Sequence, residues 1–242
     1  DGRTVVAVAA ISFESGSNQF GLAVLDASTA DFRTTTVKAE TEDFPLSAKA
    51  ESIPDALLQE LARVSPRELL LPADRLEAWS LMLTDSLDDV ALTSVSDESY
   101  SAREEAADWP GDFAEGKDPG SRAAVAVANY LTANQPFAAN NPPRLRRYEI
   151  ADSVVLDAST RRHLELHENS EDRGRSGTLI AELDETCCAL GARRLSHWLS
   201  YPLLSPVEIS TRQDAVGGLL ERDRVRGRMR EALGRVRDLE RI

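Results

Sequence analysis

The sequence contains few of the residue types that carry redox or metal chemistry. Its 242 residues include 2 cysteines and 3 histidines. Cys187 and Cys188 are adjacent, and ring strain disfavours a disulfide between neighbours, so we expect reduced thiols and an intracellular protein. The histidines at positions 163, 167 and 197 have no zinc-ligand spacing relative to these cysteines. The sequence therefore excludes a disulfide-stabilised secreted domain and a structural zinc site.

Long apolar runs and a signal sequence are also missing. No apolar run approaches the length of about 18 residues that a membrane-spanning helix requires. The start, Asp1-Gly2-Arg3-Thr4, has no initiator methionine and none of the basic and apolar regions of a signal peptide. The end, residues 239–242, carries no helix stop signal. We expect no membrane contact, and we interpret both ends as interior positions of a longer chain.

Positive charge is scarce in the first half of the chain. The formal net charge is −13, from 28 basic and 41 acidic residues. Residues 1–120 hold 24 acids and 9 bases, and residues 121–242 hold 17 acids and 19 bases. A nucleic-acid-binding domain normally has a basic excess, so the composition argues against DNA binding by the first half. The abrupt change in charge predicts two modules, residues 1–120 and 121–242.

The first module has the hydrophobic pattern of a mixed α/β fold. Three β-rich runs separated by short turns predict an antiparallel meander. Helical spacing then alternates with two further apolar runs, and Ser52-x-x-Asp55 resembles a helix-capping signal. The acidic stretch 97–120 lacks periodicity and is interpreted as a linker or mobile loop. The expected elements are strands 4–11, 20–26 and 31–37, a helix at 52–64, a strand at 67–72, a helix at 73–83 and a strand at 90–95.

The second module is predicted to be all α-helical. Asp157 or Ser159 is expected to cap a short helix that ends at Leu166, and a polar loop follows at 168–176. Ser205-Pro206 with Glu208 is a strong helix start, because Ser suits the N-cap, Pro the first turn and Glu the third position. The other expected helices are 123–132, a long helix at 178–200, the helix from 205 to about 217–218, and 221–236.

One segment has the spacing of a phosphate-binding loop. Residues 111–117 match G-x-x-x-x-G-K, but Asp118 stands where the motif needs Ser or Thr. A buried strand does not precede it, and its acidic residues would repel a triphosphate. We interpret the segment as an acidic loop and expect no nucleotide site.

Other candidate sites are incomplete. Asp26, Asp31 and Asp43 lie near predicted strand ends, but a two-metal nuclease site needs more carboxylates brought together, so turn residues are favoured. His163 and His167 have i, i+4 spacing without a third ligand. Activation of the Cys187 thiol is disfavoured by the acids that precede it. Alternate arginines spread around a helix, so we favour salt-bridged exposure or contact with a neighbouring acidic surface over a DNA-reading face for Arg222, Arg224, Arg226, Arg228 and Arg230. We predict no catalytic, cofactor or metal residue in this chain.

A long run of matching motif residues occupies the second module. It includes Leu183, Asp184, Thr186, Gly191, Arg193, Leu195, Trp198, Leu199, Pro202, Leu203, Ile209, Arg212, Asp214, Ala215 and Val216. Their order resembles L-D-x-T-x-T-x-M-G-x-R-L-L-x-x-W-L, P-L and I-x-x-R-x-D-A-V of the core, or lever, region in the MutS family of DNA mismatch-repair ATPases. Cys188 stands where that pattern has Thr. Further matches are Asp157, Thr160, Leu164, Glu165 and Leu166 upstream, and Asp238, Leu239, Glu240 and Arg241 near the end.

The first module resembles the connector domain of the same family. Residues 21–29 with Phe32 match its strand–turn–strand, and residues 60–72 match its helix-to-strand passage. The resemblance implies an α/β plus all-α chain: a ribonuclease-H-like mixed sheet with flanking helices, followed by a long-helix lever domain. It implies no chemistry in this chain, which would relay ATP state and dock a MutL-like protein through the connector.

The resemblance also implies properties of a longer parent protein. Other domains of the parent would bind ATP, magnesium and mismatched DNA, and the parent would be a cytoplasmic homodimer acting on the chromosome. Two alternatives remain open: a MutS paralogue acting on branched or recombining DNA, and a divergent ribonuclease-H-like nuclease. Because partner helices are missing from the motif region, we expect exposed apolar surface on the second module.

Overall fold

The computed structural model describes residues 7–14, 18–27, 30–39, 53–87, 89–101, 109–110, 118–134, 142–150, 153–154, 156 and 158–236. The chain divides into two compact units. We call Val5–Ile150 the sheet unit, and Ala151–Ile242 with Asp1–Thr4 the helical unit. The boundary therefore lies after residue 150, whereas the change in charge predicted it after residue 120.

The sheet unit is built on six strands in the order β5-β4-β1-β2-β3-β6. β1, β2 and β3 pair antiparallel, which confirms the predicted meander. β4 pairs parallel with β1, β5 parallel with β4, and β6 parallel with β3. β6 was not predicted. The strands are β1 (Ala7–Phe13), β2 (Gln19–Asp26), β3 (Asp31–Lys38), β4 (Glu68–Pro72), β5 (Ala91–Val95) and β6 (Leu145–Arg147).

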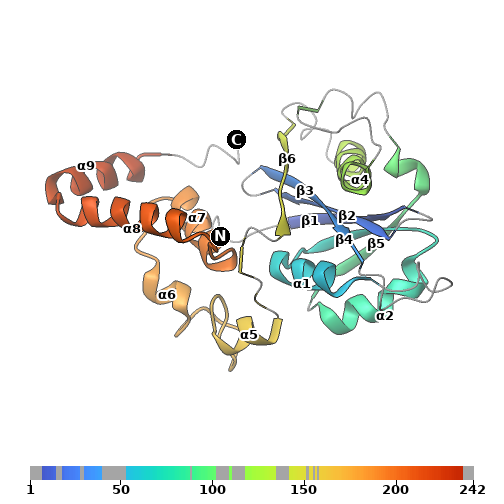
Figure 1. The fold of residues 1–242 in the computed structure, drawn as a ribbon, viewed down its shortest axis with the longest axis horizontal. Helices are drawn as coiled ribbons and strands as arrows, with labels where there is room; N and C mark the ends of the chain where they lie inside the picture. The colour runs from blue at the N-terminus through green and yellow to red at the C-terminus, as the bar shows by residue number, and fades with distance from the viewer. Residues whose placement is uncertain are drawn as a thin grey trace. The chain divides into compact units, whose positions relative to one another are not determined.

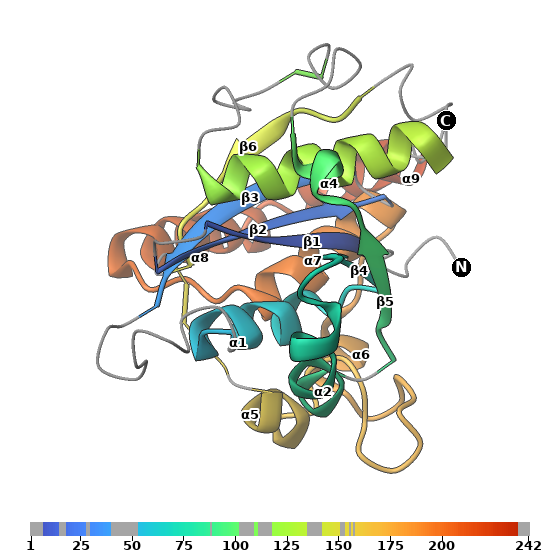
Figure 2. The same cartoon turned by 90° about the vertical axis from the view of Figure 1, so that its right-hand side faces the viewer.

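Helices cover both faces of this sheet. α4 (Pro119–Asn134) lies on one face, and α1 (Asp55–Val64) and α2 (Leu76–Ser86) lie on the other (Figures 1 and 2). Under α4, Phe32 and Trp109 meet edge to face with their ring centroids 5.8 Å apart. On the α2 face, Trp79 is fully buried beside Phe20. The mixed sheet with flanking helices agrees with the predicted α/β module.

The predicted Ser52 cap does not begin α1. Pro54 occupies the N-cap without a side-chain hydrogen bond, and Ser52 lies outside the described residues.

The described residues of the stretch 97–120 lie within the sheet unit. Residues 97–100 form a short 3₁₀ helix, and the side chains of Tyr100 and Trp109 are buried in the core of the sheet unit. The Pro110 carbonyl accepts a hydrogen bond from the Leu145 N–H at 2.9 Å. α4, predicted as the first helix of the second module, starts at Pro119 and packs on the sheet. Of the two predicted alternatives, a linker or a mobile loop, the linker is wrong for the described residues, which belong to the sheet unit.

The helical unit contains five described helices. They are α5 (Ala158–His163), α6 (Leu179–Leu183), α7 (Ala189–Ser200), α8 (Pro206–Leu220) and α9 (Asp223–Gly234). The predicted start of α8 is confirmed, because the Ser205 side chain accepts a hydrogen bond from the Glu208 N–H at 3.4 Å. α8 continues through the two glycines at 217–218, where the prediction ended it.

The single long helix predicted at 178–200 was wrong. Residues 184–188 interrupt it and separate α6 from α7. None of the described helices is long and apolar enough to cross a membrane.

Candidate functional site

The start of α4 lies unusually close to the sheet. A Cβ atom added at Gly21 in β2 would stand 2.0 Å from the Pro119 carbonyl oxygen. A Cβ atom added at Gly120 would stand 2.9 Å from the hydroxyl oxygens of both Thr34 and Thr36. Glycine is therefore required at position 21, where any side chain would push the helix off the strand, and a side chain at position 120 would force the two hydroxyls to shift.

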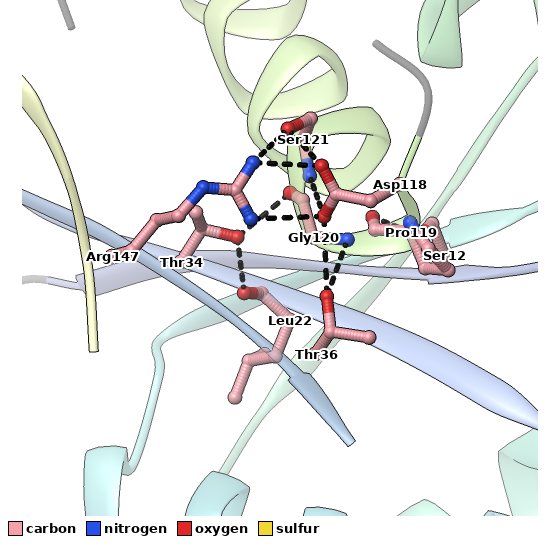
Figure 3. Close-up of polar contacts among 9 residues, drawn as sticks. All are labelled: Ser12, Leu22, Thr34, Thr36, Asp118, Pro119, Gly120, Ser121 and Arg147. Carbon is pink, nitrogen blue, oxygen red and sulfur yellow. Dashed lines mark hydrogen bonds and ion pairs between the residues drawn. The ribbon is translucent and has the colours of Figure 1, made fainter. Parts of the chain in front are cut away.

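A polar cluster holds this helix start in place, and we call it the α4 clasp: Ser12, Thr34, Thr36, Asp118, Ser121 and Arg147 (Figure 3). Asp118 caps the helix by accepting hydrogen bonds from the Ser121 N–H at 3.2 Å and the Ser121 hydroxyl at 2.5 Å. Arg147 of β6 donates to both carboxylate oxygens of Asp118, at 3.1 and 2.7 Å. The clasp thus ties β6 to α4.

Strand side chains complete the α4 clasp from below. The Ser12 hydroxyl donates to the Pro119 carbonyl. The Thr34 hydroxyl lies 2.7 Å from the Gly120 carbonyl oxygen, and the Thr36 hydroxyl accepts from the Gly120 N–H at 3.2 Å. Burial acts to raise the pKa of Asp118, but the hydrogen bonds from Arg147 and Ser121 outweigh it and hold that pKa well below its usual range. The cluster is internally paired and suits a structural role.

A second polar cluster lies on the opposite face of the sheet unit. Glu60 and Arg63 of α1 form an ion pair whose side chains are 0% and 3% exposed. The Tyr148 hydroxyl donates to the Glu60 carboxylate at 2.8 Å, and the Arg33 guanidinium lies 5.2 Å from the Tyr148 ring centroid. Tyr148 also donates its N–H to the Thr34 carbonyl at 3.0 Å. These contacts fasten the last residues of the sheet unit to α1 and β3.

In the helical unit, motif residues organise the interruption between α6 and α7. The Asp184 carboxylate accepts hydrogen bonds from the N–H and hydroxyl of Thr186 and from the Arg175 guanidinium. These contacts keep the pKa of Asp184 below its ordinary value, although partial burial acts to raise it. Arg230 of α9 donates to the Glu185 carbonyl at 2.8 Å. The interruption is therefore a fixed corner that α9 also contacts.

Other motif residues join neighbouring helices of the same unit. The Arg212 guanidinium of α8 lies 4.0 Å from the Trp198 ring centroid of α7, a cation–π contact. Arg193 is buried in α7. The Pro202 carbonyl accepts from the Val154 N–H at 2.9 Å, beside an isolated bridge between Ser153 and Leu203.

The motif Leu164-Glu165-Leu166 lies against the first turn of α6. The carbonyls of Glu165 and Leu166 accept the N–H groups of Leu179 and Ile180, both at 3.0 Å. Glu165 has a positive φ of 45° and its side chain accepts from the N–H of Ser170 at 2.8 Å.

The remaining predicted motif positions are not brought into these contacts. Leu183 is 49% exposed, and Asp214 lies on the exposed face of α8. Thr160 lies in α5, where its carbonyl accepts the Leu164 N–H at 2.9 Å, and Gly191 lies in the first turn of α7. Asp157, Asp238, Glu240 and Arg241 lie outside the described residues.

The described residues contain no group of three or more potential metal ligands. Asp26 and Asp31 are paired residues at the end of β2 and the start of β3. Asp43 and residues 111–117 lie outside the described residues. His167 does not pair with His163: its Nε2 lies 3.0 Å from the Ser200 hydroxyl oxygen. Burial, aided by two nearby arginines, lowers the pKa of His167 to about 4.

The cysteines and the alternate arginines also depart from their predicted helical settings. Cys187 was predicted inside a helix, but both partly exposed thiols lie in the interruption before α7. Arg226 donates to the carbonyls of Leu219 and Leu220, and Arg230 donates to that of Glu185. Among the described residues, Arg226 also pairs with Asp223. The predicted salt-bridged face is thus present in part.

Two family descriptions match this chain in consecutive blocks. "MutS domain II" matches residues 5–143, and "MutS domain III" matches residues 159–242. The chain belongs to the MutS family.

Curated MutS proteins support the same assignment. The chain is 34% identical to the DNA mismatch repair protein MutS of Syntrophobacter fumaroxidans, over 97% of this chain and 26% of that protein. It is 33% identical to the MutS protein of Desulforapulum autotrophicum, over 92% of this chain and 25% of that protein. It is 32% identical to the MutS protein of Methanothrix thermoacetophila, over 97% of this chain and 24% of that protein. The chain thus spans about a quarter of the length of these relatives.

Each of the two MutS domain matches falls within one structural unit. The domain II match ends before β6, and the domain III match begins at the start of α5. Sequence reasoning found motif residues of domain III but missed the α4 clasp and the Glu60–Arg63 pair of domain II. One signal was available: Asp118-Pro119 is an N-cap residue followed by Pro in the first turn. Nothing local marks Glu60 or Arg63 as buried.

Proposed function

We propose that this chain is the connector and the first part of the lever of a DNA mismatch-recognition protein. In this role it performs no chemistry, docks a MutL-like protein through the sheet unit and relays the nucleotide state of a longer protein through the helical unit. The observation that carries the proposal is the consecutive pair of MutS domain matches, II then III, over nearly the whole chain.

The topology of the sheet supports a ribonuclease-H-like connector. A three-stranded antiparallel meander is extended beyond β1 by two parallel strands, and helices cover both faces. In a connector of this kind the sheet serves as a scaffold. The α4 clasp and the Glu60–Arg63 pair give that scaffold paired polar groups on both faces.

The packing of the helical unit supports a relay. α8 contacts α7 through Arg212 on the Trp198 ring, and α9 contacts the interruption before α7 through Arg230 on the Glu185 carbonyl. Helices joined in this way move as rigid elements, and a change at one end is carried to the other when the unit has two arrangements.

The longer protein supplies the remaining activities in this proposal. Its other domains bind ATP with magnesium and mismatched DNA, and it acts as a cytoplasmic homodimer. Mismatch repair is favoured over a paralogue acting on branched DNA, because the relatives named above are DNA mismatch repair proteins.

A parallel titration tests the proposal. The chain is titrated at moderate salt with the MutL-like protein of the same organism and, separately, with a DNA duplex. Binding to the MutL-like protein without DNA affinity is the expected result, because residues 1–120 carry 24 acids and 9 bases. Tight DNA binding that weakens steeply with salt would contradict the division of labour. Binding to neither ligand would contradict the docking role.

A further inference from the structure

The two edges of the six-stranded sheet differ in how they are protected. β6 has three residues, two of them arginine, and follows Pro142-Pro143. Short strands, charged side chains and nearby prolines are the usual means of blocking an exposed edge. β5 forms the other edge with the sequence Ala-Leu-Thr-Ser-Val, which has neither a charged residue nor a proline. Only the β5 edge thus lacks these protections.

The hydrogen bonds of β5 show which backbone groups face outward. The Ala91 N–H donates to the Arg67 carbonyl at 2.9 Å, and the Val95 carbonyl accepts from the Ala73 N–H at 3.0 Å. Alternate residues of a strand point their backbone groups to opposite sides, so Leu92 and Ser94 direct theirs away from β4. Within the described part of the chain, no residue bonds to these outward groups, and Figure 2 shows no described strand beyond β5.

The surroundings of this edge are strongly acidic. Residues 67–101 contain 8 acids and 2 bases. Asp89 just before β5, Asp97 and Glu98 just after it, and Asp85 near the end of α2 are all exposed. Such a surface attracts a cationic segment and repels nucleic acid. It also disfavours pairing of two β5 edges from two copies, since that would bring the same acids together.

We propose that β5 is a strand-addition site for an extended segment of the MutL-like partner, with Lys or Arg residues flanking the part that pairs. The outward backbone groups of Leu92 and Ser94 supply the hydrogen bonds, and the acidic residues around the strand select the charge of the segment. This inference rests on the proposed docking function and specifies its location and its mode.

Two substitutions at one position test the proposal. Ser94→Pro removes the outward N–H and blocks an added strand, whereas Ser94→Ala keeps that N–H. Affinity for the MutL-like protein is measured with the full chain by titration calorimetry, with thermal unfolding and sedimentation recorded for each variant. We expect Ser94→Pro to weaken binding at least about tenfold, and Ser94→Ala to change it less than about twofold.

A second variant keeps the test independent of any strain that proline introduces. Asp97→Asn with Glu98→Gln leaves the backbone of β5 unchanged and removes two acids, so we expect weaker binding and a smaller dependence on salt. Unchanged affinity in Ser94→Pro, with wild-type binding intact, would overturn the strand-addition site alone. Failure of the wild-type chain to bind would instead contradict the docking function. A β5-dependent dimer without partner binding would overturn the choice of occupant.

Discussion

The sheet unit and the helical unit bury their side chains to very different degrees. α4 buries Val125, Val127 and Leu131 against the sheet, whereas α8 and α9 have no buried residue. Of the thirteen large apolar side chains exposed among the described residues, only Leu81 belongs to the sheet unit. The predicted apolar surface of the second module is thereby confirmed. The sheet unit is stabilised by its own core, and the helical unit relies more on caps and directed polar contacts.

One charged pair from each unit shows a similar contrast. In the sheet unit the Glu60–Arg63 pair is almost completely buried. In the helical unit, Arg235 and Glu231 pair with side chains that are 77% and 67% exposed. Exposed pairs contribute little because water screens them, whereas removal of one partner from a buried pair leaves an uncompensated charge. Equivalent substitutions should therefore have unequal effects in the two units.

The largest expected effect comes from the buried pair. Arg63→Met should lower the free energy of unfolding of the sheet unit by about 3–5 kcal/mol, because the Glu60 carboxylate loses its buried partner. The matched change Arg235→Met should cost less than about 1 kcal/mol. Urea denaturation measures both, with Trp79 and Trp109 reporting on the sheet unit and Trp198 on the helical unit. Equal costs would mean that burial does not distinguish the two pairs.

Acidification should lower the stability of the helical unit before that of the sheet unit. His167 has its pKa lowered from 6.5 to about 4, so the folded helical unit resists a proton that the unfolded chain accepts. Stability of the helical unit should fall as the pH decreases from about 6.5 to about 4, by up to about 3 kcal/mol. The measurement is the midpoint of urea unfolding against pH, followed through Trp198.

The sheet unit provides the internal control for this pH series. The pKa of Asp118 lies well below its usual range, so its contribution is present above the unfolded value of about 3.9 and is lost only at lower pH. The Trp79 and Trp109 signals should therefore show no loss from this group between pH 6.5 and 4.5. His167→Gln should flatten the response of the helical unit, and a slope that persists in that variant would assign the effect to other groups.

Replacement of a glycine by alanine should change stability in opposite directions in the two units. Gly21→Ala places a methyl group where the Pro119 carbonyl lies, so α4 must move and the sheet unit should lose about 2–3 kcal/mol. Gly227 in α9 has no atom within 4 Å of an added Cβ. Gly227→Ala should stabilise the helical unit by about 0.5–1 kcal/mol, because glycine weakens a helix interior. Thermal unfolding of the two variants measures the contrast, and a destabilised Gly227→Ala would show that α9 is packed more closely than described.

Elements with a local apolar periodicity were predicted well from the sequence, whereas long-range packing was predicted poorly. The meander, α1 and β5 were found because alternating or helical apolar spacing is a local property. β6 was missed because Leu-Arg-Arg has no alternation and becomes a strand only by pairing with β3. α4 was found as a helix but placed in the wrong unit, since the close approach of Gly120 to Thr34 and Thr36 cannot be read from spacing.

The interruption between α6 and α7 shows a different limit. Leucines continue at helical spacing from 179 to 199, so the pattern predicts one helix. Asp184 instead bonds to the N–H of Thr186, which competes with helical hydrogen bonding at that point. The motif residues there were identified through family resemblance, and their contacts with Arg175 and Arg230 emerge only from the fold.

The last prediction concerns the cap of α7. Cys188 is its N-cap residue in an extended conformation, with no side-chain hydrogen bond to the helix, whereas Ser205 caps α8. Cys188→Thr restores the hydroxyl that the family pattern has here, and it should stabilise the helical unit by about 1 kcal/mol. Cys187→Ser, one residue outside the cap, should change stability by less than about 0.5 kcal/mol. The urea unfolding transition followed through Trp198 measures both variants. Equal stabilisation would show that the added hydroxyl acts independently of the cap position.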